Sequence, residues 1–172
     1  MPIIPDVKDW TWVLQRPCPE CGFDVSACTP ATVPGKLANM LPRWRAALRR
    51  PDVAERPDEN TWSVLEYACH VRDVFTLFDH RLDLMLTEDD ARFADWDQDL
   101  TAVEKDYANA DPAEVSTELT AEGEQIAASF GRVPEEQWGR KGTRSNGSEF
   151  TVLTFSQYFL HDVVHHLHDV EG

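Results

Sequence analysis

Hydrophobic residues recur at helical spacing in four segments of the chain, at about residues 34–48, 62–86, 112–130 and 151–170. In the first three segments they form stripes, which is typical of helices that bury one side. The fourth segment is apolar almost all round, so we expect it to be the most buried helix. No convincing run of alternating polar and apolar residues accompanies them. The pattern therefore predicts an all-α fold, a four-helix bundle.

The segments outside these helices predict how the bundle is connected. Residues 87–110, between the second and third helices, are too many for a tight turn and predict a long crossover or a lid. Residues 139–148 are basic and rich in glycine, which predicts an exposed loop. Residues 1–30 are rich in proline and lack a helical period. We therefore expect a bundle domain over residues 31–172, preceded by an irregular N-terminal arm over residues 1–30.

Two helix starts have candidate capping residues. Asn60 or Thr61 is the candidate N-cap of the second helix, because side-chain oxygens of these residue types accept hydrogen bonds from the first turn. Asp111 followed by Pro112 predicts the start of the third helix, since proline is favoured at the first helical position.

Composition and charge restrict the partners. The chain has 172 residues, of which 42% are hydrophobic, enough for the core of one domain. The 16 Lys and Arg against 31 Asp and Glu give a formal net charge of −15. Such an excess repels phosphate, so we expect no nucleic acid and no membrane as partner. Without a basic, apolar leader or a membrane-spanning run, the sequence predicts a cytoplasmic protein.

Histidines supply candidate metal ligands. His161 and His165 stand four residues apart in the predicted fourth helix, which brings both imidazoles within reach of one ion. His70, on the inward arc of the second helix, is the natural third ligand. Three histidines leave a coordination position open, as catalytic sites do. His168 offers a competing pair with His165, and the spacing alone does not choose between them.

Other polar residues lie near these three histidines in the predicted helices. His80 and His166 are expected at the surface or beside the site, since His166 points about 100° away from His165. Asp162 is expected to face away from His161. Glu66 and Asp73 flank His70 at positions −4 and +3, so either could accept its N–H or act as a base. The alternative is that both only solubilise their helix.

Cysteines indicate a second candidate metal site. Cys18 and Cys21 form a C-x-x-C within Pro-Cys-Pro-Glu-Cys-Gly, which has the form of a zinc knuckle. A closed zinc site needs two further ligands, and Cys28 together with a histidine could complete it. The alternatives are a reversible disulfide and inert thiols. Cys69, beside His70 in the sequence, is expected to be a small core residue.

Two motifs resemble those of the DinB-like (DinB/YfiT) superfamily. Residues 62–73 contain W-S-x-x-E with a following H-x-x-D, and residues 159–166 contain H-x-x-x-H. The resemblance extends over residues 30–170 and implies a four-helix bundle that holds a divalent ion, often nickel or zinc, with three histidines. Carried over, this triad falls on His70, His161 and His165, and the resemblance thereby decides against His168.

The resemblance also implies a chemistry. Characterised members of the superfamily are metal-dependent transferases and isomerases that use mycothiol or bacillithiol, and they include mycothiol-dependent maleylpyruvate isomerase. We therefore expect an enzyme, a monomer or homodimer, whose partners are a small-molecule thiol and an electrophile. The alternative is a non-catalytic bundle that binds metal, another protein or a ligand. Because acidic residues concentrate in residues 88–111, which we expect beside the pocket, neutral or cationic electrophiles are the predicted preference.

Overall fold

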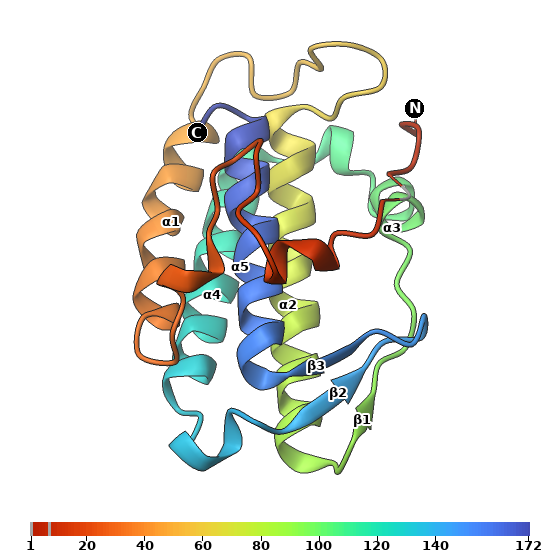
Figure 1. The fold of residues 1–172 in the computed structure, drawn as a ribbon. Coiled ribbons are helices and arrows are strands. Elements are labelled where there is room, and N and C mark those ends of the chain that lie inside the picture. The colour runs from red at the N-terminus through yellow and green to blue at the C-terminus, as the bar shows by residue number, and fades with distance from the viewer. Residues whose placement is uncertain (1, 7) are drawn as a thin grey trace.

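Four long helices form the bundle that the hydrophobic pattern predicts (Figure 1). The computed structural model describes residues 2–6 and 8–172. The four helices are α1 (Val33–Ala47), α2 (Val64–Thr87), α4 (Pro112–Gly131) and α5 (Val152–Asp169). α1 and α2 each pack against both α4 and α5. The predicted fold class is confirmed.

Aromatic side chains fill the centre of the bundle. Phe159 of α5 is fully buried, and its ring lies 5.2 Å from that of Phe78 and 5.8 Å from that of Phe75, centroid to centroid. The expectation that α5 is the most buried helix is wrong, because 14 of the 24 residues of α2 are buried against 8 of the 18 in α5. The cause is a polar edge on α5, whose histidines and carboxylates face the arm and the pockets.

Helix starts follow the local capping chemistry. Ser63 caps α2, since its Oγ accepts a hydrogen bond from the Glu66 amide at 3.2 Å while Glu66 Oε2 accepts one from the Ser63 amide at 2.9 Å. The prediction of Asn60 or Thr61 as N-cap is therefore wrong by two to three residues. The Asp111–Pro112 start of α4 is confirmed, with the Asp111 carboxylate accepting two backbone hydrogen bonds.

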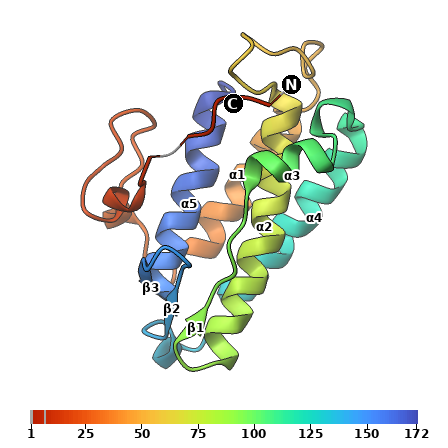
Figure 2. The same ribbon diagram turned by 90° about the vertical axis from the view of Figure 1, so that its right-hand side faces the viewer.

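The crossover between α2 and α4 is structured rather than loose. It contains strand β1 (Ala91–Arg92), helix α3 (Gln98–Glu104) and the short 3-10 helix η3 (Tyr107–Asn109). Asp73 of α2 ties the end of this crossover to the bundle, because it accepts hydrogen bonds from the hydroxyl of Tyr107 at 2.5 Å and from Lys105 Nζ at 2.9 Å. The crossover consequently covers one side of α2 (Figure 2).

A small three-stranded sheet closes one end of the bundle, where the sequence predicts only an exposed loop. β2 (Lys141–Thr143) pairs antiparallel with β3 (Glu149–Thr151) and parallel with β1. Strands of two or three residues are too short to show alternation. Gly142 is required here, since a Cβ at this position would lie 2.5 Å from Phe93 Cζ and 2.9 Å from Met85 Cγ.

The N-terminal arm lies along the outer side of α5 (Figure 2). Two single turns of 3-10 helix interrupt its irregular path, η1 (Thr11–Leu14) and η2 (Val25–Ala27). Val13 and Phe23 are its buried hydrophobic anchors. In the described part of the chain, no helix combines the length and the apolar character needed to cross a membrane.

Candidate functional site

His70 of α2 meets Asp162 and His166 of α5 between the two helices. One possible ligand atom from each residue lies within 4.8 Å of the other two. His70 Nε2 is 3.7 Å from Asp162 Oδ2, and His166 Nε2 is 3.5 Å from Asp162 Oδ1. A tetrahedral ion with bonds of 2.0–2.1 Å holds such atoms about 3.3 Å apart. The cluster, called the His70 cluster below, therefore has the spacing of a divalent metal site.

The burial of this cluster supports the same interpretation. Neither ring nitrogen of His70 has a hydrogen-bond partner among the residues that the structure describes, although the side chain is buried. Oδ2 of Asp162 is buried and unpartnered in the same way. Leaving such atoms unpaired is costly. A cation between His70 and Asp162 would satisfy both, and two imidazoles with one carboxylate suit zinc, nickel and iron.

The surroundings of His70 and Asp162 favour the protonation states that a metal ion requires of its ligands. Burial lowers the pKa of His70 and outweighs the nearby Asp162 carboxylate, so the ring is neutral, as a metal ligand must be. Burial alone would raise the pKa of Asp162, but the charge of the neighbouring His166 holds it well below its usual range. His166 is different, because Asp162 and Asp169 outweigh burial and raise its pKa to about 10. Metal binding at this cluster would therefore release a proton from His166.

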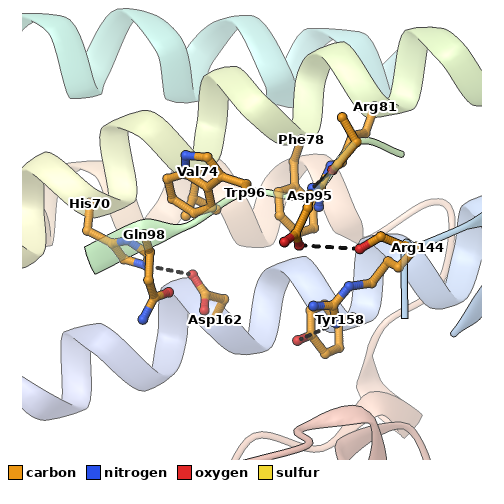
Figure 3. Close-up of a pocket in the computed structure, with 12 residues that line it drawn as sticks. His70, Val74, Phe78, Arg81, Asp95, Trp96, Gln98, Arg144, Tyr158 and Asp162 are labelled. Atoms are coloured by element: carbon orange, nitrogen blue, oxygen red, sulfur yellow. Dashed lines mark hydrogen bonds and ion pairs between the residues drawn. The ribbon is translucent and has the colours of Figure 1, made fainter. Parts of the chain in front are cut away.

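A pocket of about 110 Å³ opens beside His70 and Asp162 (Figure 3). Arg81 and Arg144 line it, and their hydrogen bonds go to the Ala94 carbonyl at 3.0 Å and the Tyr158 hydroxyl at 3.3 Å. Neither arginine takes part in any ion pair within residues 2–6 and 8–172. Burial, with Arg144 adding to it, lowers the pKa of Arg81 to about 10, so it is still charged at neutral pH.

Two tryptophans enclose the His70 ring. Trp62 lies 5.5 Å from it and Trp96 lies 5.6 Å from it, centroid to centroid, with the Trp96 ring nearly parallel at 14°. Trp96 belongs to the crossover, which also brings Asp95 to the pocket. The expectation that the crossover borders the candidate site is confirmed.

His161 and His165 lie in a second cluster, with Cys18 and Cys21 of the arm. One ligand atom from each of the four residues lies within 4.8 Å of the others. The structure thus does not gather His70, His161 and His165 around one point. Successive helical residues are about 100° apart, so the pair His161 and His165 faces the arm while the residues that follow each of them face α2.

Comparison with known proteins decides the family. A sequence model of the DinB superfamily matches residues 37–170. The chain belongs to the DinB superfamily. Among solved structures, YfiT from Bacillus subtilis, described as a probable metal-dependent hydrolase with an unusual four-helix bundle topology, superposes on this DinB-superfamily chain with a TM-score of 0.73 at 19% sequence identity. The match covers 83% of this chain and 84% of YfiT, and shows a shared fold. No curated protein matches significantly.

The remaining predicted residues of this DinB-superfamily chain lie apart from the two clusters. Cys28 is buried, with its Sγ 3.9 Å from the Asp24 carbonyl, and does not join Cys18 and Cys21. His80 and His168 are exposed. Cys69 is fully buried, so its expected core role is confirmed.

Glu66 and Asp73 are engaged with other partners. Arg56 donates to Glu66 through Nε at 2.9 Å and Nη2 at 2.5 Å, in addition to the capping bond from Ser63. Asp73 accepts from Arg72 Nε at 3.0 Å besides its bonds to the crossover. Neither carboxylate is hydrogen-bonded to His70 in the described structure. Their proposed role as base or histidine partner therefore stays a prediction without a supporting contact.

Sequence reasoning missed Asp162 and His166 as a possible ligand pair. The sequence does contain a signal for this pair, because Asp162 and His166 are four residues apart, as His161 and His165 are, one position further along the helix. Arg81 and Arg144 gave no comparable signal, since only the fold brings residues of α2 and of the turn between β2 and β3 to one pocket.

Acid should destabilise the bundle through Glu66 and Asp73. Burial alone would raise both pKa values, but hydrogen bonds outweigh it, from Arg56 to Glu66 and from Tyr107 to Asp73, and lower both. Each carboxylate therefore stabilises the fold above its ordinary pKa, and this contribution is lost as the pH falls through and below that value. We expect the free energy of unfolding, measured in urea, to decrease from pH 5 towards pH 3.

The variant Glu66→Gln isolates one of these carboxylates. At pH 7 it should lower the free energy of unfolding by about 2 kcal/mol, because the buried ion pair with Arg56 is broken. Its stability should also depend less on pH than that of the wild type. Glu124→Gln, at an exposed position of α4, is the matched control and should change neither quantity. An unchanged pH dependence in Glu66→Gln would contradict the assignment.

Proposed function

We propose that this chain is a metal-dependent enzyme in which His70, Asp162 and His166 hold a divalent ion, zinc or nickel, beside a pocket for a small anionic electrophile. The reaction is transfer or isomerisation through a low-molecular-weight thiol such as mycothiol or bacillithiol. The observation that carries the proposal is a pair of possible ligands, His70 and Asp162, whose buried ligand atoms have no hydrogen-bond partner among residues 2–6 and 8–172. They lie in the wall of a pocket that also presents two arginines, neither of which forms an ion pair with a described carboxylate.

The donor set suits catalysis rather than a purely structural role. Three protein ligands leave at least one coordination position of a tetrahedral ion open to the pocket. When bound, the ion would supply a Lewis acid that lowers the pKa of a thiol or a water bound to it. His70 and Asp162 would orient the site, and the two tryptophans around His70 would keep bulk water from that side.

The pocket's charge supports an anionic substrate. Arg81 and Arg144 offer guanidinium groups, which bind carboxylates well. Asp95 is the one acidic residue of residues 88–111 that lines this pocket within the described structure, and it accepts a hydrogen bond from Ser145 at 3.3 Å. The proposed preference is thus opposite to the neutral or cationic electrophiles expected from the acidic segment.

The proposed step is a nucleophilic addition by sulfur. The thiol gives up its proton to solvent, and sulfur forms a bond to the electrophilic carbon. The electron pair of the bond that breaks at this carbon moves onto the neighbouring atom or the leaving group, which takes up a proton from solvent. Arg81 and Arg144 would hold the substrate carboxylate, so that the reacting carbon faces His70 and Asp162. For an isomerisation the sulfur–carbon bond breaks again, which regenerates the thiol.

Hydrolysis is the second candidate function, with water in place of the thiol. It is favoured by the structural similarity to YfiT, which is described as a probable metal-dependent hydrolase. A panel of small carboxylate electrophiles and esters, assayed with and without mycothiol or bacillithiol, separates the two. Thiol-dependent turnover that needs zinc or nickel supports S-transfer, whereas thiol-independent turnover supports hydrolysis. Stoichiometric metal binding without turnover on any substrate would support a non-catalytic bundle.

Arg144→Ala should weaken binding of the anionic substrate selectively. The loss of one charge-assisted hydrogen bond predicts an increase in KM of about 10- to 100-fold for a carboxylate substrate. The KM of a neutral analogue such as its methyl ester should change little. Arg45→Ala, an exposed arginine of α1, is the matched control. Equal effects on the acid and the ester would contradict the assigned role of Arg144.

A further inference from the structure

We propose that Cys18, Cys21, His161 and His165, called the Cys18 cluster below, form a closed site for a structural zinc ion that fastens the N-terminal arm to α5. This inference does not depend on the proposed enzymatic function, because no residue of the Cys18 cluster belongs to the His70 cluster.

The spacing of the four ligands fits zinc. Cys18 Sγ lies 3.8 Å from His165 Nδ1. In a tetrahedral site with zinc–sulfur bonds of 2.3 Å and zinc–nitrogen bonds of 2.0–2.1 Å, the two atoms are about 3.6 Å apart. His161 Nε2 is buried and has no hydrogen-bond partner among the described residues, so it is available as a ligand. Both cysteines are free thiols.

The backbone of the arm folds into a knuckle that presents both sulfurs. The Gly22 amide donates to the Cys18 carbonyl at 2.9 Å, and the Cys18 amide donates to the Phe23 carbonyl at 2.9 Å. Gly22 has a φ of +75°, a conformation that side-chain-bearing residues rarely adopt. The turn thus places Cys18 and Cys21 on the side that faces α5.

The surroundings of the Cys18 cluster resemble those of a structural metal site. Trp10 covers the histidines, with its ring 5.6 Å from that of His161 and 5.0 Å from that of His165. His165 Nε2 lies 3.6 Å from Glu20 Oε2 and 3.7 Å from Asp169 Oδ1. These carboxylates can accept the N–H of His165 when Nδ1 binds metal, which is how outer partners orient ligating histidines.

Charge and ligand number assign different roles to the two clusters. Two thiolates neutralise a zinc ion, and four protein ligands complete its tetrahedron, so the Cys18 cluster is closed and electrically neutral. In the His70 cluster, the single carboxylate neutralises only one of the two charges of a divalent ion. The site would keep one positive charge and, with three protein ligands, one open coordination position. A neutral, closed site can be buried at low cost and has no place for a substrate.

The zinc site would join distant parts of the chain. Cys18 and His165 are 147 residues apart in the sequence. The arm residues Lys8 and Trp10 also line a second pocket, of about 240 Å³, together with Asp162 and His166. Holding the arm in place therefore shapes a pocket that two of the proposed catalytic ligands also line.

Cobalt substitution of the full-length wild type tests this inference directly. Cobalt(II) adopts the tetrahedral geometry of zinc, and thiolate ligands add intense charge-transfer absorption in the near ultraviolet, which nitrogen and oxygen ligands do not give. We expect this absorption on adding two equivalents of cobalt, a weaker band in Cys18→Ser and in Cys21→Ser, and its loss in the double variant Cys18→Ser/Cys21→Ser. Cys28→Ser and His166→Ala should retain it, the latter even if it abolishes the other metal site.

Two results would overturn the inference. One is cobalt binding by the wild type without thiolate absorption. The other is a bound-zinc content, measured by mass spectrometry, that stays the same in the Cys18→Ser/Cys21→Ser double variant. Cys21→His guards against simple misfolding, since it keeps four ligands and should retain zinc with a weaker charge-transfer band. Failure of the proposed enzymatic function would leave all these readouts unchanged.

Discussion

His166→Ala is expected to remove the ion from the His70 cluster and to lower kcat/KM by more than about 100-fold. The physical reason is that a direct ligand is lost, and even residues that only orient a ligand contribute 10- to 100-fold to metal affinity or activity. Metal content by mass spectrometry and turnover of the thiol-dependent reaction measure both effects. Asp162→Asn should act in the same direction, because it removes the negative charge that two histidines share.

Two variants of other α5 histidines serve as controls for this expectation. His168→Ala alters an exposed histidine two residues away and should leave metal content and turnover unchanged. His165→Ala should lower metal content by one equivalent through the Cys18 cluster and preserve the ion in the His70 cluster. If His165→Ala abolished turnover while His166→Ala retained it, the assignment of the catalytic ligands would be wrong.

Loss of the Cys18 cluster is expected to have the second large effect, on stability. A ligand bound only by the folded state adds about 4 kcal/mol to the free energy of unfolding when its free concentration is 1,000 times Kd. With zinc in that excess, Cys18→Ser/Cys21→Ser should lose about this amount relative to the wild type. Urea unfolding with and without a zinc chelator measures it.

The controls for this effect separate metal from packing. The chelator should lower the stability of the wild type and of Cys28→Ser by about 4 kcal/mol more than that of the double variant, which can lose only the ion of the His70 cluster. Trypsin should cut the arm after Lys8 faster in the double variant, because the arm is then held only by contacts such as Val13 and Phe23. Equal cleavage rates and equal stability with and without chelator would contradict a structural zinc.

The fold could be predicted because its main signal is local. The helical period of apolar residues gives all four long helices, and Asp111 with Pro112 marks one start correctly. Ser63 was missed as the N-cap of α2, because several capping residues precede that helix and only the reciprocal bond with Glu66 decides between them. The three strands were missed because each is shorter than a detectable alternation.

The candidate site could be predicted only in part, because tertiary contacts decide which side chains come together in each cluster. Spacing and the family resemblance pointed to histidines of α2 and α5, the two helices whose side chains form the clusters described above. Residues 161–166 carry two overlapping ligand pairs, and a helix rotates about 100° per residue, so a shift by one position changes the partner from the arm to α2. The cysteine motif pointed to the two arm residues of the proposed zinc site, but could not show which histidines lie beside them.

Anomalous diffraction at the zinc edge, from crystals of the zinc-loaded wild type, tests the central claim most directly. The claim is that α5 carries two interleaved metal sites. We predict two peaks, one bounded by His70, Asp162 and His166 and one bounded by the two cysteines of the arm with His161 and His165. A single peak shared by His70, His161 and His165 would contradict it.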